Sequence, residues 1–261
     1  MDLVLEGKTA LVCGSTQGIG WSIAQALASH GATCILFARN AQVLKEKVAE
    51  LAQPCQQLHH HAVADFNDQA QLRKVVSELV KQHTIHILIN NTGGPRAGMI
   101  SDALAADFES AFRQHLLANH LLAQAVIPGM KTTGFGRIIN IISTSVRIPI
   151  ENLGVSNTIR AAVASWSKTM ANEVGSFGIT VNSILPGYTD TQRLRTLIEA
   201  NALRRGVPAL IIEQEMKESI PARRFGKPEE VAAVAAFLAS PAAAYVNGIS
   251  IPVDGGKTGT I

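Results

Sequence analysis

The chain has 261 residues, 47% of them apolar, and a formal net charge of +3. This length and composition predict one large α/β domain with a sizeable core, and the mild charge without a basic run argues against nucleic acid as a partner. Three cysteines, an odd number without metal-ligand spacing, are typical of a reducing compartment. The apolar run near the start is too short for a signal peptide or a membrane span, so we expect a cytoplasmic protein with no membrane association.

Strand-like and helix-like patterns alternate along the chain. Apolar runs predict strands over residues 8–13, 33–38, 61–64, 85–90, 137–143, 179–185 and 248–253. Helical periodicity predicts helices over 18–29, 40–52, 67–82, 102–131, 156–175 and 228–239. This alternation predicts one domain over residues 1–261, a doubly wound, Rossmann-like parallel sheet of seven strands with helices on both faces. Residues 190–226, helical and rich in Arg and Glu, are either a lid inserted near the site or a surface helical hairpin.

The first predicted strand runs into a glycine-rich turn and then into the first helix. Gly14, Gly18 and Gly20 form the pattern Gly-x-x-x-Gly-x-Gly. Glycine tolerates positive φ and lets the backbone approach a ligand closely, and the N-terminus of a helix suits a pyrophosphate. The context of strand, turn and helix predicts dinucleotide binding, with an ordinary tight turn as the alternative.

Polar or small residues also follow the next three strands. Arg39 follows the second strand, where an NAD site usually offers an acidic side chain, so it favours NADP through a 2′-phosphate, with NAD as the alternative. A solvated side chain is the other interpretation of Arg39. Asp65-Phe66 ends the third strand and could meet adenine, and Asn90-Asn91-Thr92-Gly93-Gly94 ends the fourth. Open α/β sheets bind ligands at this carboxyl edge.

The later strand ends complete a set of motifs. Ser143 follows the fifth strand, Pro186-Gly187-Tyr188-Thr189-Asp190-Thr191 follows the sixth, and Val253-Asp254-Gly255-Gly256 lies near the end of the chain. With the glycine turn, these motifs resemble the short-chain dehydrogenase/reductase family, most of all its 3-oxoacyl-acyl-carrier-protein reductase branch, over nearly the whole chain. The resemblance implies an NADP(H)-dependent oxidoreductase acting on a carbonyl or secondary alcohol, such as a 3-oxoacyl thioester. It also implies a dimer or tetramer, because the helices matching 102–131 and 156–175 pair between subunits in this family.

The resemblance further implies roles for individual residues. Ser143 matches the serine that hydrogen-bonds the substrate carbonyl oxygen. The residues expected to contact the cofactor are Gly14, Ser15, Thr16, Gln17, Gly18, Ile19, Gly20, Arg39, Asp65, Phe66, Asn90, Asn91, Gly93, Arg160, Pro186, Gly187, Thr189 and Thr191. The expected partners are therefore the cofactor, a small-molecule or acyl-thioester substrate and further copies of the chain.

The sequence departs from the family where proton transfer takes place. The family motif Tyr-x-x-x-Lys, about thirteen positions after the serine, is replaced by Ser156 and Arg160, and His115 aligns with the family's helix asparagine. A serine hydroxyl is a much weaker acid than a phenol, and arginine stays protonated, so it cannot relay a proton as lysine can. We expect Arg160 to hold the nicotinamide ribose, and Ser156 with His115, titrating near neutral pH, to form the proton route. Tyr188 is the alternative donor.

These departures leave two other functions open. The chain could be a nucleotide-binding regulator or partner subunit that has lost reductase activity, or a lyase or isomerase built on the same scaffold. No metal site is expected at His59-His60-His61, because adjacent strand residues point to opposite faces. Arg193, Arg195, Arg204 and Arg205 could meet the phosphate of a pantetheine arm, although a solvated charged face explains them as well.

Overall fold

The computed structural model describes residues 2–260, and its centre is one parallel sheet. The strands are β1 (Thr9–Cys13), β2 (Thr33–Ala38), β3 (His60–Val63), β4 (Ile87–Asn90), β5 (Gly136–Ile141), β6 (Ile179–Pro186) and β7 (Ser250–Val253). They follow one another in the order β3-β2-β1-β4-β5-β6-β7, and every neighbouring pair is parallel. Strands β1 to β3 are added successively toward one edge of the sheet, and β4 to β7 toward the other. The strand order therefore reverses between β1 and β4, which is the position where open α/β sheets form a ligand crevice.

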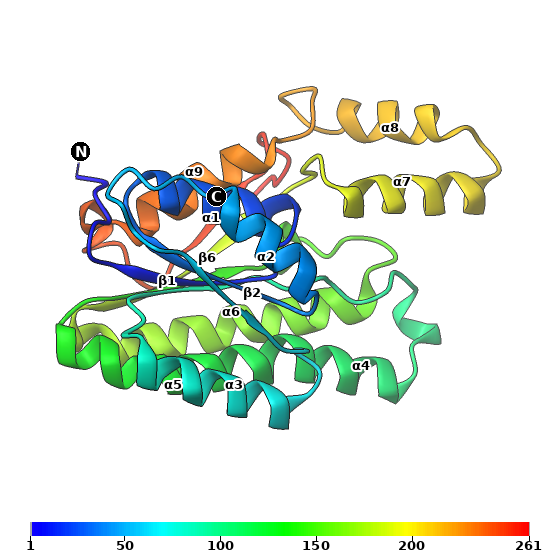
Figure 1. The fold of residues 1–261 in the computed structure, drawn as a ribbon. Helices are drawn as coiled ribbons and strands as arrows, with labels where there is room; N and C mark the ends of the chain where they lie inside the picture. Colours follow the sequence, from blue (N-terminus) through cyan, green and yellow to red (C-terminus); the bar gives the residue numbers. More distant parts are fainter. Residues whose placement is uncertain (1, 261) are drawn as a thin grey trace.

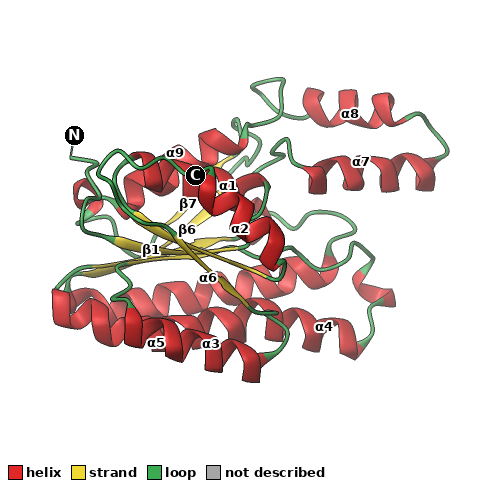
Figure 2. Cartoon of the chain, viewed as in Figure 1, coloured by secondary structure: helices red, strands yellow, loops and turns green. Residues whose placement is uncertain are grey.

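Helices cover both faces of this sheet (Figures 1 and 2). One layer contains α1 (Gly18–Ser29), α2 (Ala41–Ala49) and α9 (Pro228–Ala239). The other contains α3 (Gln69–Gln82), α4 (Ala105–Ala111), α5 (Ala118–Thr133) and α6 (Gly154–Val174). A further pair, α7 (Gln192–Arg205) and α8 (Ala209–Glu218), projects from the body between β6 and α9. The predicted fold class is therefore confirmed.

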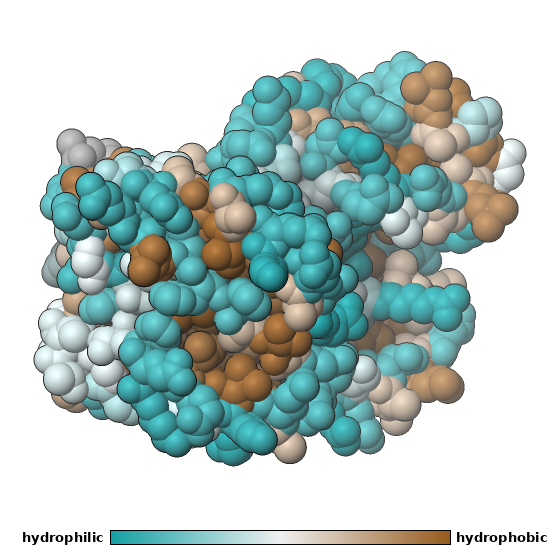
Figure 3. Space-filling view, viewed as in Figure 1, coloured by the Kyte–Doolittle hydropathy of each residue, from teal (hydrophilic) through white to brown (hydrophobic). Residues whose placement is uncertain are grey.

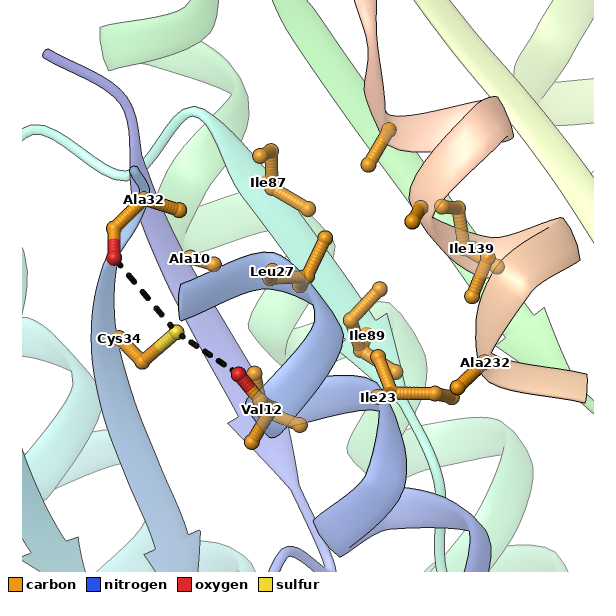
Figure 4. Packing of buried hydrophobic residues seen from close by; sticks show 14 of the residues in the cluster. Ala10, Val12, Ile23, Leu27, Ala32, Cys34, Ile87, Ile89, Ile139 and Ala232 are labelled. Carbon is orange, nitrogen blue, oxygen red and sulfur yellow. Dashed lines mark hydrogen bonds between the residues drawn. The ribbon is translucent and has the colours of Figure 1, made fainter. Parts of the chain in front are cut away.

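Each face of the sheet contributes to its own apolar core, because successive strand residues point in opposite directions. Val12 and Ile89 pack with Ile23 and Leu27 of α1, and Figure 4 shows these side chains interlocking beneath α1. Leu11, on the opposite face, belongs to a second cluster with residues of α3, α5 and α6. Two buried faces explain why the strand segments are continuously apolar rather than alternating.

The segment predicted as one helix over 102–131 is more complex in the structure. Residues Phe112–Leu117, between α4 and α5, form a π-helical turn that carries His115. A π-helical turn accommodates an extra residue in an α-helix and occurs often at functional sites. The helical pattern alone could not reveal it, because one inserted residue shifts the periodicity only locally.

The surface has two features that bear on assembly. Leu203 and Leu210 are exposed at the far end of the α7–α8 pair, where Figure 3 shows apolar side chains gathered. The outer face of α6, with Ala161 and Ser165, is open in the single chain, so pairing of subunits through this helix stays a prediction.

Among the helices of residues 2–260, none has both the length and the apolar character needed to cross a membrane.

Candidate active site

The glycine turn packs so closely that side chains are excluded from it. Gly14 and Gly18 have φ values of 58° and 56°, in the left-handed region that favours glycine. A Cβ at Gly20 would lie 2.2 Å from the carbonyl oxygen of Gly14. The amide Nδ2 of Asn91 donates to the carbonyl oxygens of Gly14, at 3.1 Å, and Cys13, at 3.3 Å. The end of β4 therefore holds the turn in place.

The N-terminus of α1 is suited to an anion. Gln17 is the N-cap residue, yet its side chain makes no capping hydrogen bond, and the first turn contains no acidic residue. The first N–H groups of the helix therefore find no side-chain acceptor among residues 2–260, and the positive end of the helix dipole faces the turn. Both properties fit the pyrophosphate of a dinucleotide.

A cleft of about 690 Å³ extends from this turn along the carboxyl edge of β1, β2 and β3. Eleven of the residues predicted to contact the cofactor line it: Gly14, Thr16, Gln17, Gly18, Ile19, Arg39, Asp65, Phe66, Asn91, Gly93 and Thr191. Arg39 is exposed at its edge. We call this space the cofactor cleft.

Three of the predicted cofactor residues lie outside both clefts of the site. The Ser15 hydroxyl is buried and accepts a hydrogen bond from the Phe37 N–H at 3.0 Å, and Gly20 packs against the turn. Asn90 points into the protein, where its Nδ2 donates to Oδ1 of Asn140 at 2.8 Å. Asn140 in turn donates to the Ser167 hydroxyl, which also accepts from Ser183. In the structure these three residues support the framework from behind the cleft.

A second cleft, of about 440 Å³, adjoins the first and contains the predicted catalytic residues other than His115. Ser143, Ser156, Arg160, Pro186, Gly187 and Thr189 line it, while Ile19, Asn91, Thr92, Thr191 and Arg193 border both spaces. Apolar side chains, among them Ile142, Ile148, Leu153, Leu194 and Leu197, form much of the remaining wall. We call this space the substrate cleft.

Ser143 and Arg160 are held in the substrate cleft by backbone contacts. The Ser143 hydroxyl oxygen accepts from the N–H of Ser145 at 3.1 Å, which leaves its proton free to donate. Arg160, only 8% exposed, donates to the carbonyl oxygens of Ile141 at 2.8 Å and Thr92 at 3.5 Å, and so connects the ends of β5 and β4. Burial, and secondarily the charge of Arg193, lowers the pKa of Arg160 to about 10. The guanidinium therefore stays charged at neutral pH.

His115 lies behind this wall and is not a group that titrates near neutral pH. Its ring Nδ1 is 2.7 Å from the Thr92 hydroxyl, and its Nε2 is buried without a hydrogen-bond partner among the described residues. Burial first, and then the charges of Arg160 and Arg193, lower the pKa of His115 to about 2. The expectation that His115 titrates near neutrality is therefore wrong, because desolvation by burial and two nearby cations disfavour the imidazolium.

Nearly the whole chain matches a known enzyme family. A family model described as "Enoyl-(Acyl carrier protein) reductase" matches residues 14–258. The chain belongs to the short-chain dehydrogenase/reductase family. It is 33% identical to the 3-oxoacyl-[acyl-carrier-protein] reductase FabG of Aquifex aeolicus, over 98% of this chain and 99% of that protein. It is 32% identical to the D-beta-hydroxybutyrate dehydrogenase of Cupriavidus necator, over 97% of this chain and 98% of that protein.

Solved structures agree with this assignment. The L-sorbose reductase of Gluconobacter frateurii, complexed with NADPH and L-sorbose, matches with a TM-score of 0.93 and 30% identity over the full length of both chains. As a short-chain dehydrogenase/reductase, the chain is an NAD(P)-dependent oxidoreductase.

The buried imidazole of this oxidoreductase predicts a dependence of stability on pH. The unfolded chain protonates His115 near pH 6.5, whereas the folded chain does so only near pH 2. Between these values the unfolded state binds the extra proton, so the free energy of unfolding falls with falling pH, by about 1 kcal/mol per unit. From pH 7 to pH 5, His115→Asn should lose less stability in urea than the wild type. His61→Asn, which removes an exposed imidazole, is the control, and equal losses for all three proteins would refute the assignment.

One residue of the substrate cleft escaped the sequence analysis. Lys257 follows the glycine pair after β7 and lines the cleft beside Tyr188. Its position directly after the motif Val253-Asp254-Gly255-Gly256, at the carboxyl edge of the last strand, is the sequence signal that marks it. Of the four arginines of α7, Arg193 alone lines the substrate cleft, while Arg195 and Arg205 form ion pairs with Asp190 and Glu215.

Proposed function

We propose that this chain is an NADP(H)-dependent oxidoreductase that interconverts a carbonyl and a secondary alcohol with an atypical proton-donor set. The observation that carries the proposal is the junction of the two clefts: Ser143 and Arg160 line the substrate cleft, which shares part of its wall with the cofactor cleft. When bound, NADP(H) supplies or accepts the hydride. Everything else in the reaction falls to the side chains of the chain itself.

Arg39 supports NADP over NAD. It lies exposed at the edge of the cofactor cleft, after β2, and forms no ion pair within residues 2–260. Its guanidinium is therefore available to bind a 2′-phosphate through two parallel charge-assisted hydrogen bonds. The positive φ glycines and the uncapped start of α1 fit the pyrophosphate of the same molecule.

In the substrate cleft, the proposal assigns separate tasks to Ser143 and Arg160. The free proton of Ser143 would donate to the substrate oxygen and orient the carbonyl. Arg160 would hold the nicotinamide ribose and stabilise the negative charge that develops on that oxygen, with Ser156 and Arg160 replacing the family's Tyr and Lys. A fixed charge in a partly dry site is effective because it needs little reorganisation as the oxygen becomes anionic.

The proton itself would reach the oxygen from solvent along the Ser156 hydroxyl. His115 stays neutral at physiological pH, so it can order Thr92 by hydrogen bonding but cannot serve as an imidazolium donor. Tyr188 also lines the cleft, but burial raises its pKa, which makes it a weaker acid than free tyrosine. We therefore assign His115 a positioning role and Tyr188 a place in the cleft wall.

The relatives suggest the first substrate to test. One is named as a 3-oxoacyl-[acyl-carrier-protein] reductase and another as a D-beta-hydroxybutyrate dehydrogenase, and both names describe an acyl group oxygenated at the third carbon. A short 3-oxoacyl thioester and the corresponding free acid are therefore the initial test compounds.

The test is NADPH or NADH oxidation with these compounds, in wild type and in Ser143→Ala. Loss of the Ser143 donor should lower kcat by about 100-fold, the scale for one oxyanion donor, with the Kd for NADPH unchanged. Ser165→Ala, on the open face of α6, controls for loss of a serine hydroxyl. Product without a change in cofactor absorbance would indicate a lyase or isomerase. Binding of NADPH without turnover of any carbonyl or alcohol would indicate a nucleotide-binding regulator, and either result would overturn the proposal.

A further inference from the structure

The substrate cleft is lined by cations and, within residues 2–260, by no acidic side chain. Arg160, Arg193 and Lys257 all face it. They come from three separate parts of the chain: α6, the start of α7 and the segment after β7. Their convergence concentrates positive charge where a substrate would enter, and a concave site strengthens the resulting potential.

These three cations also form no ion pair, whereas several of their neighbours do. Around the α7–α8 pair, Arg195 pairs with Asp190, Arg205 with Glu215, Lys217 with Glu213 and Arg224 with Glu230. By contrast, no carboxylate of the described chain lies within ion-pair distance of Arg160, Arg193 or Lys257. Arg204 and Arg223 are exposed and also lack an ion pair, but neither lines the cleft, whereas Arg160, Arg193 and Lys257 face it and are left for a ligand.

The two arginines approach a common point. A Cβ placed on Gly94 would lie 2.7 Å from Nη2 of Arg193 and 3.4 Å from Nη2 of Arg160. Arg193 also donates from Nη2 to the carbonyl oxygen of Pro95 at 3.0 Å, which holds it at the rim. Although its side chain is exposed there, partial burial lowers its pKa. Two like charges held together without a counterion repel one another, so an anion between them would be stabilised.

Lys257 offers a separate anchor in the substrate cleft, on the segment after β7. Its Nζ donates to the Ser219 hydroxyl at 2.8 Å and lies 5.1 Å from the centre of the Tyr188 ring. An ammonium has three donors, so two remain for a ligand. Arg193 borders the cofactor cleft as well and could meet cofactor phosphates. Lys257, by contrast, lines the substrate cleft and does not border the cofactor cleft.

We propose that the substrate is an oxo or hydroxy acid whose carboxylate binds Lys257, while its hydrocarbon part lies on the apolar wall. The inference rests on the proposed function and names its substrate class. A phosphate on a pantetheine arm is the other anion to consider. It is separated from the reacting carbonyl by the whole arm, so it would lie outside the cleft, whereas Lys257 lies inside it.

A binding experiment tests this inference without requiring turnover. Hexanoate and hexanamide, which match in size but differ in charge, are titrated calorimetrically into the full chain saturated with NADP⁺. Hexanoate should bind at least about 10-fold more tightly, the scale of one charge-assisted hydrogen bond, and Lys257→Gln should remove this preference. Lys257→Arg should restore part of it. Lys74→Gln, which removes an exposed charge on α3, should keep it in full.

Each outcome decides the question. Equal affinity for acid and amide, or a preference that persists in Lys257→Gln, would overturn the inference. A dependence on Lys257 for 4′-phosphopantetheine but not for hexanoate would assign the cation to a carrier arm instead. A panel of 3-oxo acids and their methyl esters then measures turnover. Preferential binding of hexanoate with no turnover of the panel would refute the proposed function but not the anion site, so the two failures are distinguishable.

Discussion

Replacing Arg160 with Met is expected to lower kcat/KM for the proposed reduction by about 100- to 1,000-fold, the range for loss of one preorganised donor at a developing oxyanion. The side chain is buried in the wall of the substrate cleft, and its charge faces no carboxylate within the described chain. Methionine fills a similar volume but supplies neither charge nor donors, so the carbonyl oxygens of Ile141 and Thr92 also lose a partner. Arg160→Lys should recover part of the activity, since it keeps the charge without the planar fork.

Two measurements separate this role from a structural one. Arg137 is a matched control, because it is a buried arginine at the opposite end of β5 that donates to the carbonyl oxygens of Gly136, Gly178 and Ser240. Arg137→Met should lower stability without changing kcat/KM. In Arg160→Met, the pKa of His115, followed by NMR, should rise, because the charge of Arg160 contributes to lowering it. An Arg160→Met enzyme within twofold of wild-type kcat/KM would make the side chain a framework residue only.

Replacing Gly20 with Ala should weaken cofactor binding strongly. The added methyl carbon would lie 2.2 Å from the carbonyl oxygen of Gly14 and 2.5 Å from Nδ2 of Asn91, so the turn and the end of β4 must separate. Forced repacking of this kind costs about 1–3 kcal/mol of stability. It also displaces the N–H groups that face the pyrophosphate, so we expect the Kd for NADPH to rise at least about 100-fold, for a loss of two hydrogen bonds to a charged group.

Fluorescence titration of NADPH and urea unfolding would measure the two effects of this variant. Gly129→Ala is the control: it lies within α5, and its added carbon meets nothing closer than 3.5 Å. Helix propensity favours Ala over Gly by about 1 kcal/mol, so this second variant should be slightly more stable and bind NADPH normally. Normal NADPH binding by Gly20→Ala would show that the turn does not form the cofactor site.

Most of the fold could be predicted because its signals are local. Continuous apolar runs located the strands, and Pro228 at the first position of α9 marked the start of that helix at the right residue. The helical pair inserted after β6 was also predicted, although its action as a lid stays a prediction. The π-helical turn at Phe112–Leu117 was missed, because a single extra residue leaves the apolar pattern on either side intact.

The site was less predictable, because its properties depend on residues that are distant in the chain. Asn90 and Asn91 are the same residue type at adjacent positions, so the sequence does not distinguish them. Only Asn91 reaches the cofactor cleft, since successive residues of a strand point to opposite sides. The neutrality of His115 depends first on its burial and then on two arginines from α6 and α7. The role of Lys257 depends on the segment after β7 returning beside Tyr188. No local pattern contains that information.

The buried polar row behind the site has a consequence for folding accuracy. Asn90, Asn140 and Ser183 occupy laterally paired positions on β4, β5 and β6, within strands whose other residues are mostly interchangeable hydrophobic ones. If β5 slid along its neighbours by two residues, the Asn140 amide would lie among apolar side chains, at a cost of about 1–3 kcal/mol, and an isoleucine would face Asn90 and Ser183 in its place. The polar row therefore favours the native strand register over registers shifted by two residues. Because Ser143 lies two residues beyond β5, the same discrimination determines how far the proposed donor hydroxyl extends toward the substrate.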